Sequence, residues 1–215
     1  PAEQFTPAGI VAAPSSPAIP DANQKLAQDN YSAAGYPGCA GAPEPLRLRV
    51  PDDDPAWLEL GQAIAEQWST ALGCTPALFS VEELSRTLLI ELAHSTYDAE
   101  IVTRPHAWLA TWSADYPDAH AWLNDALHCR YGYFRTGREC DQADAALDSA
   151  ANILDSAARA QTYDQAERLF FGAEGTYPVI PLLFSVSAWL QSPGLSGVNE
   201  VGAARFDKWS LSAGE

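Results

Sequence analysis

A strand followed directly by a helix with clear ends, in residues 46–73, is the feature that most constrains the fold of this chain. Residues 46–50 alternate apolar and basic side chains, which predicts a half-buried β-strand. Asp54 can cap the helix that follows, and Pro55 suits its first position. Apolar residues then recur at helical spacing up to Gly73, namely Trp57, Leu60, Ile64, Trp68 and Leu72. The sequence therefore predicts a β-α unit.

A second strand and helix are predicted directly afterwards. Residues 76–80 have the composition of a strand, and Ser80 with Glu83 matches a capping box at the start of a helix. The helix would continue through the apolar residues Leu84, Leu88 and Leu92. Because strand-helix-strand crossovers are right-handed, the two strands should be parallel, and we expect an α/β fold with a mixed, largely parallel sheet flanked by helices.

The beginning of the chain has a different composition. Residues 1–20 contain five prolines among Ala and Ser, so we expect an extended or irregular segment that buries no core face. Asp21 can cap a helix that ends near Gly35. We therefore expect residues 1–20 to be a Pro-rich connecting segment and residues 21–215 to be a single domain.

An apolar run that ends in a polar loop is the candidate for a binding site. Residues 107–112 suit a strand buried on both faces, and Pro117 with Asp118 can begin the next helix. Asp115 falls where the chain leaves the sheet, which is where ligands bind in open α/β sheets. On local sequence alone, Asp115 suits ligand binding and capping of the helix at Pro117 equally well.

The remaining elements are predicted from periodicity and caps. A helix is expected at residues 119–127, a second from Asp141 to about residue 158, and a third that starts at Thr162 or Asp164. Residues 179–184 are predicted to form a strand at a sheet edge or bulge, since Pro181 lacks a backbone donor.

Charge and composition exclude some classes of partner. The formal net charge of −16 repels phosphate backbones and anionic lipid, so we expect no nucleic-acid partner. No apolar run approaches the roughly 20 residues that span a bilayer. The chain contains no Met, so we expect a processed product or an excised piece.

Four cysteines allow three disulfide pairings. Cys39 and Cys74 each precede a predicted parallel strand, and such strand starts lie at the same end of a sheet. Cys129 and Cys140 flank a loop that contains glycines. We expect the pairs Cys39–Cys74 and Cys129–Cys140; the alternative is four reduced thiols in a cytosolic protein.

No catalytic motif is present in the sequence: it contains no Gly-x-Ser-x-Gly, no His-Glu-x-x-His and no phosphate loop. Asp115 and Asp118 could act as an acid-base pair, but no nucleophile or oxyanion site accompanies them. We therefore expect neither an enzyme nor a cofactor.

Two groups of residues have the side chains of a possible metal site. The first is the run of three carboxylates at residues 52–54, which suits solvated caps before a helix better than a metal. The second is a zinc site formed by His120, His128, Cys129 and Cys140. A disulfide with exposed imidazoles is the preferred interpretation of the second group, so we expect no metal.

The segment that begins at Trp112 and continues through Asp115, Tyr116 and Pro117 to Asp118 has the pattern Trp-x-x-Asp-Tyr-Pro-Asp. It resembles the family 5 extracellular solute-binding proteins, which capture peptides, nickel complexes or oligosaccharides for ABC importers. Further segments match the family in the order in which they occur along the chain, and together they span nearly all of it. They are residues 33–37, 72–74, 178–182 with Trp189, and 205–209.

The resemblance implies that this chain is the second lobe of a two-lobed periplasmic-binding-protein-like fold. The ligand-binding residues would be Trp112, Asp115, Tyr116 and Asp118. In peptide-binding members, the Asp at the position of Asp115 holds the α-ammonium of the peptide. The arginine that binds the substrate carboxylate in the family has no clear counterpart, because Arg104 lies in a suspected insertion at residues 99–106.

The same resemblance implies partners and a location. These are a peptide or other small ligand, a first lobe missing from this chain, and the permease of an ABC transporter. The protein would be an extracytoplasmic monomer, in the periplasm or on the outer face of a bacterial membrane as a lipoprotein. The alternative is the extracellular sensory domain of a membrane receptor or regulator.

Overall fold

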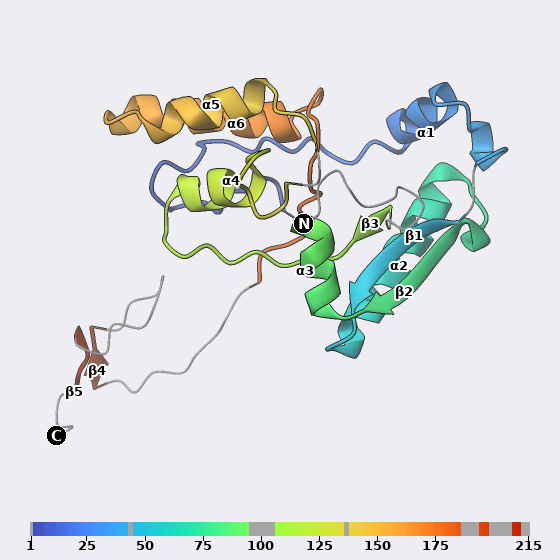
Figure 1. The fold of residues 1–215 in the computed structure, drawn as a ribbon, viewed down its shortest axis with the longest axis horizontal. Helices are drawn as coiled ribbons and strands as arrows, with labels where there is room; N and C mark the ends of the chain where they lie inside the picture. Colours follow the sequence, from blue (N-terminus) through green and yellow to red (C-terminus); the bar gives the residue numbers. More distant parts are fainter. Residues whose placement is uncertain are drawn as a thin grey trace. The chain divides into compact units, whose positions relative to one another are not determined.

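The computed structural model describes residues 2–42, 45–94, 106–135, 138–185, 194–197 and 208–211 (Figure 1). The chain forms two compact units. Unit 1 comprises Pro1–Pro20, Ser113–Gly132 and Cys140–Glu215, and unit 2 comprises Asp21–Trp112 and Tyr133–Glu139. Residues 1–20 thus belong with unit 1. Whether residues 21–215 act as one domain stays a prediction.

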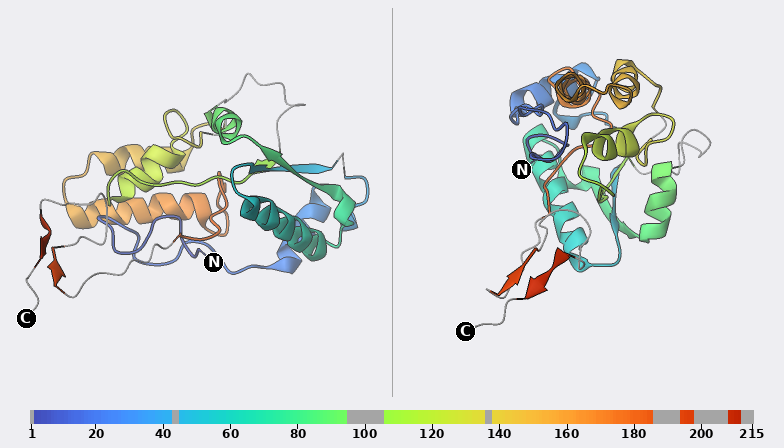
Figure 2. Two further views of the ribbon diagram at one scale, coloured as in Figure 1. Left: turned by 90° about the horizontal axis from the view of Figure 1, so that it is seen from below. Right: turned by 90° about the vertical axis from the view of Figure 1, so that its left-hand side faces the viewer.

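Unit 2 is built on a three-stranded parallel sheet (Figure 1). Its strands are β1 (Leu46–Pro51), β2 (Phe79–Leu84) and β3 (Ala107–Trp108), in the order β2-β1-β3. The two crossovers move in opposite directions along the sheet, so right-handed connections place their helices on opposite faces. Figure 2 shows this arrangement for α2 (Pro55–Leu72) and α3 (Arg86–His94). The predicted parallel α/β architecture is confirmed.

The core of unit 2 lies between β1 and α2. Leu48, Val50 and Leu109 are buried and form its centre. The side chains that pack against this centre are Trp57, Leu58, Leu60, Ile64, Val81 and Ala107. At Gly61, a Cβ would lie 2.7 Å from Val50 Cγ1 and 2.9 Å from Val81 Cγ1, so helix and sheet approach each other closely where a side chain is missing.

Both ends of α2 are as predicted. The Asp54 carboxylate accepts a hydrogen bond from the Ala56 N–H at 2.9 Å, and Pro55 occupies the first turn. Gly73 ends the helix with φ of 72°, in the left-handed region that favours glycine. The preceding helix α1 (Gln24–Ala33) is capped by Asn23, so the prediction of Asp21 as its cap is wrong.

The second strand and helix are displaced from their predicted positions. Residues Pro76–Leu78 form the 3₁₀ turn η2, and β2 extends to Leu84. The predicted capping box at Ser80 and Glu83 is wrong, because these residues pair with β1 along the parallel ladder. A short 3₁₀ turn, η1 (Pro37–Cys39), follows α1.

The third strand is shorter than predicted. Only Ala107–Trp108 form β3, and the Leu109 N–H makes the last hydrogen bond of the ladder, to the Arg49 carbonyl at 2.9 Å. The prediction of a strand over residues 107–112 is therefore wrong for residues 109–112, which lie outside β3. The suspected insertion, apart from His106, lies outside the described residues.

Unit 1 contains three helices in its described part: α4 (Ala119–Leu127), α5 (Gln142–Ala151) and α6 (Ser156–Phe171). Its largest buried side chains are Tyr163, Phe170, Phe171, Leu123, Leu127 and Leu147. The predicted bounds of α4 are confirmed. The prediction of a helix from Asp141 to about residue 158 is wrong, because α5 ends at Ala151 and Asp155 caps α6.

Irregular chain makes up much of the rest of unit 1. Phe5 and Thr6 are buried, so the prediction that residues 1–20 bury no core face is wrong. Residues 179–184 are irregular and not a strand. In the tail, β4 (Leu195–Ser196) and β5 (Ser210–Leu211) form an antiparallel pair.

Both disulfides have the predicted pairing. Cys39 is bonded to Cys74 within unit 2, with their Cα atoms 5.3 Å apart. Cys129 is bonded to Cys140 within unit 1, with a Cα separation of 5.2 Å.

Candidate functional site

A small pocket lies at the carboxyl ends of the parallel strands in unit 2. Pro51 ends β1, Arg86 begins the helix after β2, and residues 109–111 follow β3. We call this cavity of about 200 Å³ the rim pocket. Its lining consists of Pro51, Arg86, Leu89, Ile90, Trp108, Leu109, Ala110, Thr111, Tyr133 and Phe134. Ligands of open α/β sheets bind at this edge, so the rim pocket occupies a position suited to binding.

Arg86 is held in a defined position at this pocket. Its Nε lies 2.6 Å from Asp53 Oδ2 and its Nη2 lies 3.1 Å from Asp53 Oδ1, so both carboxylate oxygens accept from the guanidinium. These hydrogen bonds lower the pKa of Asp53 and raise the pKa of Arg86. The guanidinium also lies 5.9 Å from the centre of the Trp57 ring.

An aromatic group of unit 2 contains the first of the predicted ligand-binding residues. The ring of Trp112 lies 5.4 Å from that of Tyr133 and 6.0 Å from that of Phe134. Tyr133 and Phe134 contact each other edge to face at 4.8 Å. Trp112 is half-buried, so part of its indole is accounted for by packing and part is open to solvent.

The other three predicted residues belong to unit 1, and Asp118 has a structural role there. Its carboxylate accepts from the His120 N–H at 2.8 Å and so caps α4. It also receives two hydrogen bonds from Arg159, at 2.8 and 2.6 Å. Burial pushes the pKa of Asp118 upward, but the Arg159 and His120 hydrogen bonds outweigh burial and hold this pKa below its ordinary value.

The hydroxyl of Tyr116 is engaged by neighbours on α4. It lies 2.7 Å from His120 Nδ1 and donates to Asp125 Oδ2 at 3.0 Å. Burial and the Asp125 carboxylate raise the pKa of Tyr116 to about 12, so the phenol is neutral at physiological pH. Its ring is stacked on that of His120. The residue as a whole is 42% exposed.

Asp115 differs from both of these residues. Helix α4 begins at Ala119 and has Asp118 as its cap, so the alternative interpretation of Asp115 as the cap is wrong. Asp115 is exposed in the loop between β3 and α4. In the part of the chain that the structure describes, its carboxylate has no hydrogen bond and no ion pair. This carboxylate is therefore available to a ligand.

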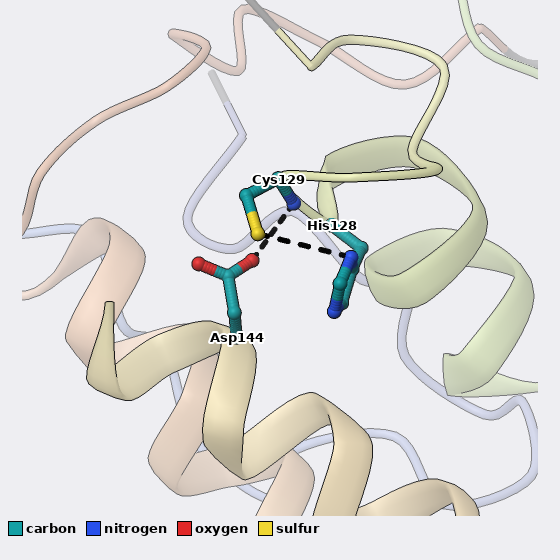
Figure 3. A group of neighbouring side chains, drawn as sticks. All are labelled: His128, Cys129 and Asp144. Atoms are coloured by element: carbon teal, nitrogen blue, oxygen red, sulfur yellow. Dashed lines mark hydrogen bonds between the residues drawn. The ribbon is translucent and has the colours of Figure 1, made fainter. Parts of the chain in front are cut away.

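A second cluster, shown in Figure 3, brings potential metal ligands together in unit 1. Atoms of His128, Cys129 and Asp144 lie within 4.8 Å of one another, and all three residues are buried. The sulfur of Cys129 is bonded to Cys140 and is therefore not a thiolate. His128 Nδ1 accepts from the Arg130 N–H at 3.2 Å. The zinc interpretation is thus unsupported while the disulfide is intact.

Asp144 completes that cluster as a backbone acceptor. One of its oxygens accepts from the Cys129 N–H and the other from the Asp141 N–H, each at 2.9 Å. The second bond belongs to a capping box with Asp141 at the start of α5. Sequence reasoning identified Asp141 as a cap and missed Asp144, although an acid three residues after the cap was the signal for it.

No family model matches the chain, and no curated protein matches it. HbpA2 from Haemophilus parasuis is similar in structure, with a TM-score of 0.72 at 19% identity over 99% of this chain. The fold is that of part of a two-lobed periplasmic binding protein.

Two further solved structures agree with this assignment of the fold. DppA, an ABC transporter-associated periplasmic binding protein from Helicobacter pylori in complex with the peptide STSA, has a TM-score of 0.69 at 16% identity over 97% of this chain. A periplasmic oligopeptide-binding protein from Borrelia burgdorferi, OppAIV, has a TM-score of 0.66 at 18% identity over 83% of this chain. The chain spans 40%, 38% and 33% of the lengths of these three proteins, in the order given.

Within the described ranges, no helix combines the length and the apolar character needed to cross a bilayer.

Proposed function

We propose that this chain is the ligand-capturing part of an extracytoplasmic solute-binding protein that delivers peptides or similar small polar solutes to an ABC importer. The observation that carries the proposal is a difference between two neighbouring carboxylates, of which one has structural partners and the other does not. Asp118 caps α4 and pairs with Arg159, whereas Asp115 is exposed without a partner among the described residues. An exposed carboxylate without a partner among the described residues suits a ligand with a positive charge.

The chemistry that Asp115 would supply is capture of an ammonium group. A charge-assisted hydrogen bond from an α-ammonium to a carboxylate is about twice as strong as a neutral one. Tyr116, which is 42% exposed, would contribute apolar contact with the ligand. Peptides are the substrate class we infer, because similar structures were solved with bound peptides, including STSA in DppA and RPPGFSPFR in OppA of Haemophilus influenzae.

The proposed protein requires a first lobe in addition to this chain, and a permease as its partner. Small-molecule sites bury about 70–90% of a ligand, which a single lobe does not achieve. We therefore infer that a first lobe outside this chain completes the site and that a permease receives the ligand. Two disulfides suit an oxidising compartment such as the periplasm or the outer face of the membrane.

The test uses the native protein that contains this sequence together with its first lobe, and it compares trialanine with N-acetyl-trialanine. Asp115→Asn should weaken trialanine binding by about 2–5 kcal/mol, because the ligand ammonium is left without its counter-charge. N-acetyl-trialanine, which has no ammonium, should bind the variant and the wild type with equal and low affinity. Isothermal titration calorimetry measures both affinities.

Asp118→Asn is the matched control for the loss of one carboxylate. Asn caps a helix about as well as Asp, but the change removes the charged partner of Arg159 and should lower the unfolding free energy by about 1–3 kcal/mol. Asp115→Asn should leave the unfolding free energy unchanged. If Asp115→Asn retains full affinity for trialanine, Asp115 is not the ligand anchor.

A further inference from the structure

We propose that the rim pocket of unit 2 is a subsite for one apolar group of the ligand, about the size of a leucine side chain. The proposal rests on the proposed function, because it assigns a specificity for the ligand of that function. The size of the rim pocket suits a single side chain. Complete small-molecule sites have volumes of about 300–1,000 Å³. The rim pocket, at about 200 Å³, is too small for a whole peptide and large enough for one side chain.

The lining of the rim pocket is mostly apolar. Most of the lining residues are aliphatic or aromatic, among them Leu89 and Ile90 from α3, Leu109 after β3, and Phe134. Leu89, Leu109 and Phe134 are buried, which makes the deeper wall apolar, whereas Ile90 is 36% exposed. An apolar ligand group that enters this pocket removes its own surface and that of Ile90 from water, which favours binding.

The charge in the lining of the rim pocket comes from one residue and is paired. Arg86 is the only charged side chain among the described residues that line the rim pocket. Its Nε and Nη2 already donate to the two oxygens of Asp53. The Asp53 carboxylate offsets the charge of the guanidinium, so an acidic ligand group gains less from Arg86 than it would from an unpaired arginine. The pairing therefore cancels the charge that would otherwise select an anion, and it leaves apolar contact as the basis of selection.

The first experiment fills the pocket in the native protein with both lobes. Wild-type affinities are measured by calorimetry for trialanine and for the three tripeptides in which one alanine is replaced by leucine. We expect one position at which leucine improves affinity at least tenfold over alanine. Ile90→Trp should reduce this preference to less than twofold, because the indole occupies the pocket.

Leu88→Trp is the matched control, since Leu88 lies on the same helix, is 45% exposed and does not line the rim pocket. It should keep the leucine preference. Trialanine binding without a leucine preference at any position would overturn the subsite and leave the proposed function standing. Failure of all four peptides to bind the wild type would overturn the proposed function itself. An unchanged preference in Ile90→Trp would place the leucine elsewhere.

The second experiment tests the neutralised arginine. Asp53→Asn removes the charge that pairs with Arg86, so a tripeptide with aspartate at the leucine-preferring position should bind about tenfold tighter than it binds the wild type. Asp52→Asn removes the same charge one residue earlier, at an exposed carboxylate, and should give less than a twofold change. Equal gains in both variants would mean that overall charge, and not Arg86, selects the ligand group.

Discussion

The two compact units of this chain satisfy their buried backbone groups in different ways. In unit 2 the buried backbone belongs to a parallel sheet and to helices, which pair their own N–H and C=O groups. In unit 1, single buried side chains hold irregular chain in place. Glu167 is fully buried, and one of its oxygens accepts from the N–H groups of Phe5 and Thr6 at 2.5 and 3.2 Å.

Another buried side chain of unit 1 acts in the same way, since Asp144 accepts from the Cys129 N–H. The buried Asn124 amide links two helices, because it donates from α4 to the Leu147 carbonyl of α5 at 3.2 Å. A buried backbone group without a partner costs about as much as a lost hydrogen bond, so irregular buried chain requires such acceptors and donors. The stability of unit 2 should therefore depend on packing, and that of unit 1 on individual polar residues.

The largest expected effect separates the two units by their disulfides. In the chain-entropy model, Cys39–Cys74, with a sequence separation of 35, stabilises by about 4 kcal/mol. Cys129–Cys140, with a separation of 11, stabilises by about 3 kcal/mol. Urea unfolding of the two double Cys→Ser variants should show this order. The reverse order would show that the polar contacts of unit 1 around Cys129 depend on its disulfide.

A smaller effect is expected from packing in unit 2. Gly61→Ala places a Cβ within 2.9 Å of two valine methyl groups, and overpacking costs about 1–3 kcal/mol. Helix propensity alone would favour alanine by about 1 kcal/mol, so a net loss of about 1 kcal/mol is expected. Ala63→Gly, at an exposed position of the same helix, measures the propensity term. If Gly61→Ala raises the midpoint of thermal unfolding, the overpacking between helix and sheet costs less than the gain in helix propensity.

Unit 2 also shows how far local sequence can predict this fold. The β-α unit was predictable because Asp54, Pro55 and Gly73 mark helix ends by short-range chemistry. Ser80 and Glu83 carry an equally good local pattern for a helix start, yet they lie in β2. Pairing with β1 decides this segment, and its partner lies more than thirty residues away. A local pattern does not contain that information.

For the candidate site, the sequence identified the loop that holds both aspartates, but it did not decide which of them caps α4. Two aspartates lay within reach of a helix start, and only the observed start at Ala119 assigns the cap to Asp118. The rim pocket was not predicted, since Arg86 and Asp53 are 33 residues apart in sequence. Glu167 was missed for the same reason: its backbone partners precede it by 161 and 162 residues.

The smallest expected effect is a change in the pH dependence of stability, and it tests whether unit 1 depends on a buried acid. Burial raises the pKa of Glu167 above that of an exposed glutamate. The folded state therefore binds the proton more tightly than the unfolded state. This stabilisation is complete below the pKa of the unfolded chain and is lost as pH rises through the folded-state pKa. Glu167→Gln carries no such proton.

Glu167→Gln should therefore gain stability relative to the wild type as the pH is raised from 4 to 8. The slope of the difference should stay below about 1.4 kcal/mol per pH unit, the limit for a single proton. Unfolding free energies from urea titrations at several pH values measure it. Glu174→Gln, at an exposed glutamate of unit 1, is the matched control for the loss of one carboxylate. Parallel profiles for Glu167→Gln and the wild type would mean that Glu167 titrates alike in the folded and unfolded chain, and the contrast between polar and packed units would then lose its main support.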